Sequence, residues 1–190
     1  MGLRVGVLGS TRGTALQGVL DAMAAGTLDV EIVLVASDKV DAPILERARQ
    51  YGLRAEFFDP AGLKRDEYDA RISESLLASG AEVVLLIGYM RIVSDGFVEQ
   101  WRGRLLNVHP SLLPAFGAMT DKNVHAAVLA AGVAETGCTI HQVTEIVDGG
   151  PILLQKRCPV LPGDTVDTLK ARVQALEQAG FVEVLRRWRA

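Results

Sequence analysis

The chain opens with LRVGVLGSTRGT over residues 3–14, and this stretch indicates the fold class. Its first half, Leu3–Leu8, is rich in branched apolar residues and predicts a strand. The glycine, serine and threonine turn that follows leads into a predicted helix over residues 15–24. A strand that passes through a short turn into a helix is the repeating unit of α/β domains with a mostly parallel sheet.

The same alternation continues along the whole chain. Further strands are predicted over residues 31–36, 55–58, 83–87, 105–108, 139–143 and 152–160. Helices are predicted over residues 45–51, 65–79, 121–131 and 165–188, with a short one introduced by Ser94. Val83–Ile87 lacks polar alternation, as expected of a central strand covered on both faces. No linker or composition shift divides the chain, so we predict one domain over residues 1–190. We expect a Rossmann-like α/β fold, an open and mostly parallel sheet with helices on both faces.

The overall composition excludes several classes of partner. The 20 basic and 23 acidic residues give a net charge of −3, which disfavours binding to duplex nucleic acid. The longest apolar run, Val83–Ile87, is far shorter than the roughly 20 residues that span a bilayer. The N-terminus has no signal architecture, and Cys138 and Cys158 are expected to be reduced thiols. We therefore expect a cytoplasmic protein with no nucleic-acid or membrane partner, as a monomer or a homodimer.

The turn over residues 9–14 is a candidate phosphate site. Free backbone N–H groups and the positive end of the helix dipole meet there, and Arg12 adds charge. The turn matches neither the dinucleotide-binding glycine motif nor a P-loop, which disfavours dinucleotides, nucleoside triphosphates and an oxidoreductase function. It favours a monophosphate; the alternative is a plain strand-to-helix turn that uses glycine for its backbone freedom.

The most informative segment runs LLNVHPSLLP over residues 105–114. Side chains repeat every second residue in a strand, so Asn107 and His109 point to one side, into the crevice where α/β sheets bind ligands. An amide donor beside an imidazole suits an oxygen that gains negative charge. The alternative for His109 is a buried histidine bonded to the backbone.

Asp148 is the third candidate catalytic residue. It precedes two glycines, which permit close approach of a ligand, and its carboxylate could keep His109 charged and accept a proton. The alternative is an Asx-turn. The chain's three histidines have no zinc spacing, so no metal site is expected. No Gly-x-Ser-x-Gly elbow indicates a serine nucleophile.

These motifs resemble those of the folate-dependent formyltransferases, and above all the glycinamide ribonucleotide formyltransferases of purine biosynthesis. The resemblance covers essentially residues 1–190 and rests on four segments. They read GYMRIVS over 88–94, NVHPSLLP over 107–114, DGGP over 148–151 and RVQALE over 172–177. It implies a single formyltransferase domain that transfers a formyl group from 10-formyltetrahydrofolate to the amine of glycinamide ribonucleotide, with no metal.

The resemblance also implies a role for individual positions. It makes Asn107, His109 and Asp148 the catalytic residues. The ribonucleotide would be bound by Thr11, Arg12, Gly13, Thr14, Gly88, Pro110 and Glu177. The folate would be bound by Met90, Arg91, Ile92, Val93, Leu105, Asn107 and Val143. The chain departs from the family pattern at Ala15, where an asparagine is usual, and Arg12 is expected to replace the lost polar group.

Two alternatives to this function stay open at this point. One is a folate-dependent formyl enzyme that acts on a different amine. Relatives that formylate methionyl-tRNA carry a further C-terminal domain, for which 190 residues leave no room. The other is a non-catalytic nucleotide-binding α/β module, which would need the phosphate turn but not Asn107, His109 and Asp148 together.

Overall fold

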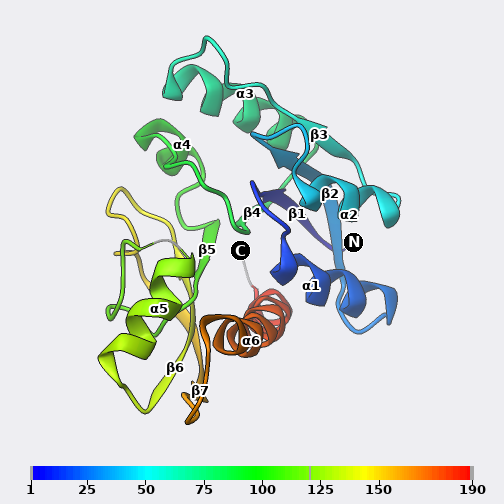
Figure 1. Cartoon of the computed structure of the whole chain (residues 1–190). Helices are drawn as coiled ribbons and strands as arrows, with labels where there is room; N and C mark the ends of the chain where they lie inside the picture. Colours follow the sequence, from blue (N-terminus) through cyan, green and yellow to red (C-terminus); the bar gives the residue numbers. More distant parts are fainter. Residues whose placement is uncertain (1, 120, 189–190) are drawn as a thin grey trace.

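The computed structural model describes residues 2–119 and 121–188. One sheet of seven strands organises the chain, in the order β3-β2-β1-β4-β5-β6-β7 (Figure 1). The strands are β1 Leu3–Leu8, β2 Val30–Ser37, β3 Ala55–Phe57, β4 Val83–Leu86, β5 Leu105–His109, β6 Glu135–Gln142 and β7 Ile152–Pro159. The pairs from β3 across to β5 are parallel, and β6 pairs antiparallel with both β5 and β7. The predicted open, mostly parallel sheet is confirmed.

Helices cover both faces of the sheet. They are α1 Thr14–Ala24, α2 Pro43–Gln50, α3 Arg65–Ala78, α4 Asp95–Gln100, α5 Asp121–Ala131 and α6 Val166–Arg187. Apolar side chains of α1, α2 and α6 form one buried cluster with the sheet, and those of α3 and α4 form another. Val83 and Leu85 belong to the first cluster and Val84 and Leu86 to the second. The central strand β4 is therefore buried on both faces, as its unbroken apolar run predicted.

Most predicted elements lie within two residues of their observed bounds. The prediction was wrong at β6, which begins at Glu135 rather than Thr139. Its first residues are held by pairing with β7, where Glu135 lies opposite Pro159. Ser94 caps α4 as predicted, because its hydroxyl accepts a hydrogen bond from the N–H of Phe97. Within the described ranges, no helix combines the length and the apolar character needed to cross a membrane.

Candidate active site

Two loops meet at the carboxyl ends of β1 and β4, where the strand order reverses. The Ser10 N–H donates to the carbonyl of Gly88 over 3.0 Å, and the Met90 N–H donates to the Ser10 hydroxyl over 2.9 Å. Gly88 has φ 60°, and a Cβ there would lie 2.3 Å from the Thr11 hydroxyl, so glycine allows this close approach. Ligands of α/β proteins bind in the crevice at such a reversal.

The first of these loops ends at an uncapped helix. Gly13 adopts φ 60° at the start of α1, and no side chain caps the free N–H groups there. Thr11 and Arg12 beside it are exposed. Arg47 of α2 contacts the backbone of this turn, since its Nε donates to the carbonyl of Arg12 over 3.2 Å. The turn thus combines helix N–H groups that no side chain caps with an exposed hydroxyl and an exposed guanidinium, which are groups that can bind an anion.

His109 lies at the carboxyl end of β5 with its ring buried between two oxygens. Its Nε2 is 2.9 Å from the carbonyl oxygen of Phe116, and its Nδ1 is 3.2 Å from Oδ2 of Asp148. A neutral imidazole carries a proton on only one nitrogen, whereas both nitrogens here face acceptors. Each ring nitrogen therefore has an oxygen to which it can donate a hydrogen bond.

Asp148 provides the charge opposite this ring. The residue lies in the loop between β6 and β7 at φ 53°, and its Oδ2 accepts the N–H of Ala118 over 2.9 Å. Burial works to raise the pKa of the carboxyl. Hydrogen bonding by His141 and by the Ala118 N–H, together with the charge of His109, outweighs burial and lowers the pKa below its ordinary value. Asp148 is therefore an ionised partner for His109.

The cluster includes a fourth residue, His141, that the sequence reasoning left without a role. Strand β6 pairs antiparallel with β5 so that His141 lies directly opposite Asn107. Its Nε2 is 3.2 Å from Nδ2 of Asn107 and 3.4 Å from Oδ1 of Asp148. The alternation of Thr139 and His141 along one strand was the available signal, but its use required the register of β6 against β5.

The segment predicted to bind folate lies between β4 and α4. Met90 and Ile92 are exposed to 50% and 64%, unusually high for apolar side chains, and Val93 is buried. The Arg91 guanidinium stacks over the Tyr68 ring at 4.5 Å. Leu105 has no exposed surface and lies beneath the partly buried Val143, whose N–H donates to its carbonyl. Leu105 therefore cannot contact a ligand directly, and it can affect binding only by supporting its neighbours.

The remaining predicted residues lie around this cluster. Pro110 follows His109 and is buried. Glu177 is buried on α6 next to β6, where burial and the Glu177 charge raise the pKa of the Cys138 thiol to about 12. Across residues 2–119 and 121–188, no group of three or more His, Cys, Asp or Glu side chains could hold a metal ion.

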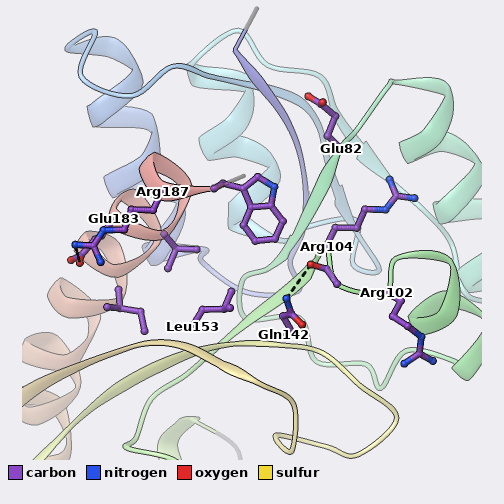
Figure 2. A pocket seen from close by; sticks show the side chains of 11 residues that line it. Glu82, Arg102, Arg104, Gln142, Leu153, Glu183 and Arg187 are labelled. Atoms are coloured by element: carbon purple, nitrogen blue, oxygen red, sulfur yellow. Dashed lines mark hydrogen bonds and ion pairs between the residues drawn. The ribbon is translucent and has the colours of Figure 1, made fainter. Parts of the chain in front are cut away.

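A separate hollow of about 550 Å³ lies at the opposite edge of the sheet (Figure 2). Glu82, Arg104 and Leu153 line it from the amino ends of β4, β5 and β7. Several of its charges are already paired: Arg187 contacts Glu183, and Arg102 contacts two glutamates. This hollow shares no residue with the cluster around His109.

A sequence profile of the formyl transferase family matches residues 3–185. The chain belongs to this family. It is 40% identical to the phosphoribosylglycinamide formyltransferase of Escherichia coli, over 96% of this chain and 85% of that one. The crystal structure of glycinamide ribonucleotide transformylase 1 from Symbiobacterium toebii superposes with a TM-score of 0.92 at 44% identity, covering 97% of this chain and 86% of that one.

Some relatives of this formyl transferase chain are much larger. It is 40% identical to the trifunctional purine biosynthetic protein adenosine-3 of Gallus gallus, over 97% of this chain. The chain spans only 18% of that protein's length. The formyl transferase fold thus occurs both in proteins of similar size and as a small part of a multifunctional chain.

Proposed function

We propose that the chain transfers the formyl group of 10-formyltetrahydrofolate to the amine of glycinamide ribonucleotide. The observation that carries this proposal is the environment of His109, a buried ring with an oxygen acceptor at each nitrogen. Membership of the formyl transferase family and the name of the Escherichia coli relative support it. The reaction needs two small molecules and no macromolecular partner.

The ribonucleotide would bind at the turn before α1. Its phosphate accepts from the uncapped N–H groups of Gly13 and Thr14, and Thr11 and Arg12 add a hydroxyl and a charge. The glycinamide end then extends past Gly88 and Pro110 toward His109. Glu177 of α6 accepts hydrogen bonds from the ribose hydroxyls. Arg12 supplies the polar contact that Ala15 lacks.

The folate would bind beside Met90–Val93, in the slot that also includes Val143 with Leu105 beneath it. The exposed Met90 and Ile92 side chains gain a partner when the ring system covers them, which favours binding through burial of apolar surface. Backbone polar groups of the segment provide directional contacts to the pterin. The bond from Met90 to Ser10 then joins the folate segment to the phosphate turn.

In the reaction, the amine nitrogen attacks the formyl carbon and the carbonyl electrons move to the formyl oxygen. Asn107 Nδ2 and His109 Nε2 donate to this oxygen, which takes the place of the Phe116 carbonyl on His109. Asp148 stabilises the charged ring and accepts the amine proton, directly or through a water. Collapse of the intermediate breaks the bond to N10 of the folate, which takes up a proton as formylglycinamide ribonucleotide and tetrahydrofolate separate.

The test is a formyl-transfer assay with purified protein, glycinamide ribonucleotide and 10-formyl-5,8-dideazafolate, following the deformylated folate. We expect release that depends on the ribonucleotide. A parallel reaction with glycinamide that lacks the ribose phosphate tests the phosphate site and should be far slower. No release, while a known formyltransferase is active in the same mixture, would refute the function.

A further inference from the structure

Arg47 of α2 contacts both the turn before α1 and α1 itself. Its side chain is partly buried, and its Nε donates to the carbonyl of Arg12 over 3.2 Å. Its Nη1 donates to Oε1 of Gln17, in the first turns of α1. Gln17 has further partners, because its Nε2 donates to the hydroxyl of Tyr51 over 2.6 Å and to Oδ1 of Asp21 over 2.7 Å. The Arg47 side chain therefore joins α2, the turn and α1.

A second bond from α2 acts on the same turn. The N–H of Ile44 donates to the carbonyl of Thr11 over 3.1 Å, so the carbonyls of two successive residues, Thr11 and Arg12, point toward α2. The peptides here are trans, and in a planar trans peptide the C=O and the N–H point to opposite sides. The N–H groups of Arg12 and Gly13 therefore point away from α2. Among the described residues, neither of them donates to a backbone carbonyl.

These two N–H groups lead directly into the uncapped start of α1. Gly13 has φ 60°, in the left-handed region, and no side chain caps the helix there. Successive backbone N–H groups at such a change of handedness form a concave site for an anion. The C=O and N–H of one peptide turn together, so the direction of these N–H groups depends on where the carbonyls of the turn are held.

We propose that Arg47 is a positioning residue for the ribonucleotide phosphate, and this inference rests on the formyl transfer proposed above. The bond from Arg47 to the Arg12 carbonyl keeps the N–H of Gly13 directed at the phosphate. Without this bond the peptide between Arg12 and Gly13 is free to turn, and its carbonyl oxygen can then face the phosphate and repel it. The bond acts on phosphate binding and not on the groups around His109, which lie on other elements.

The variants Arg47→Met and Arg47→Gln separate the hydrogen bond from the charge. Both remove the charge and have similar length, but only glutamine has an amide nitrogen, at the position along the side chain where arginine has Nε. We expect Arg47→Met to raise the KM for the ribonucleotide about tenfold, with kcat and the KM for folate within about twofold of wild type. Arg47→Gln should recover most of this loss. Equal loss in both variants, or a loss confined to kcat, would overturn the proposal.

Arg49→Met is the matched control for the charge of α2. Arg49 is exposed on the same helix, and within the described part of the chain its side chain makes no hydrogen bond or ion pair with the turn. Exposed charges are screened by salt, so the KM for the ribonucleotide should stay within about twofold of wild type. A rise as large as that of Arg47→Met would show that the KM follows the charge of α2, which would overturn the proposal.

A binding measurement without turnover distinguishes this inference from the proposed function. Ribose 5-phosphate is titrated into nitrogen-15-labelled wild type and variants, with the amide signal of Gly13 as the reporter. We expect a saturable shift of this signal, with an affinity about tenfold weaker in Arg47→Met and close to wild type in Arg47→Gln and Arg49→Met. No shift in wild type, or equal affinity in wild type and Arg47→Met, would overturn the inference. The expected shifts without formyl transfer would support the inference and refute only the proposed function.

Discussion

His109 has two oxygen neighbours, and this local chemistry decides what the residue can do. An oxygen lies near both Nδ1 and Nε2, so the ring can donate a hydrogen bond from each nitrogen, which a single backbone contact would not allow. A cationic donor aimed at a developing oxyanion stabilises the transition state more than the neutral substrate. The alternative of a plain structural histidine accounts for the Phe116 contact but not for the buried carboxylate of Asp148.

The Asn107→Ala variant tests the second donor. Removal of one such donor typically costs about 100- to 1,000-fold in kcat, and we expect a loss in that range with KM values little changed. Asn107 is only partly buried, so the variant should stay folded. Steady-state kinetics and a thermal melt check this together. Near-wild-type turnover would remove Asn107 from the mechanism.

The Asp148→Asn variant tests the charge on the loop. The pKa of Asp148 lies below its ordinary value of 3.8, so the ionised carboxylate stabilises the folded state. This contribution is fully present above the ordinary pKa and is lost as the pH falls through the lowered one. Asp148→Asn should therefore unfold at lower urea concentration than wild type at neutral pH, with the difference shrinking in acid. If the stability difference between the variant and wild type stayed the same in acid, the charge of Asp148 would not be its cause.

Among the elements, the turn between β6 and β7 depends on a glycine for its position. A Cβ on Gly150 would lie 1.8 Å from the carbonyl oxygen of Gln142, so any side chain must displace the turn. Asp148 lies two residues earlier and would move away from His109. We expect Gly150→Ala to cost about 1–3 kcal/mol of stability and to lower kcat at least tenfold.

Gly96→Ala is the matched control for Gly150→Ala, at a glycine outside the turn. Gly96 lies in α4, and a Cβ there meets nothing within 4 Å. Alanine in a helix is more stable than glycine by up to about 1 kcal/mol, so this variant should be as stable as wild type or more stable, with unchanged kcat. Urea midpoints and kcat of the two variants give the comparison. If Gly150→Ala behaved like Gly96→Ala, the turn would not position Asp148.

At the scale of the whole molecule, one sheet joins the two buried clusters on its faces. Leu16 of α1 and Leu76 of α3 are fully buried on opposite faces. Replacement of either by alanine should cost about 2–5 kcal/mol. Because both clusters share the same strands, we expect the chain to unfold as one cooperative unit.

The probes for this prediction report on different parts of the fold. In a Trp188→Phe background, Trp101 is the sole tryptophan and reports on the α3 and α4 face. In each of the two variants, Leu16→Ala and Leu76→Ala, its fluorescence and the far-ultraviolet circular dichroism should give the same unfolding midpoint. Separate transitions in Leu16→Ala would mean that the two faces unfold independently, contrary to a single domain.

The sequence by itself determined the elements and the chemistry within each of them. Apolar runs marked the strands, the turn before α1 indicated a candidate phosphate site, and the two-residue period of a strand predicted that Asn107 and His109 share one face, because these are local properties of adjacent residues. Only the tertiary structure decided that His141 lies opposite Asn107 and that Asp148 lies beside His109. The first depends on the register of β6 against β5, and the second on a loop that joins β6 to β7. Both are contacts between segments more than thirty residues apart, and the packing of the whole sheet, rather than the local pattern of residues, sets such contacts.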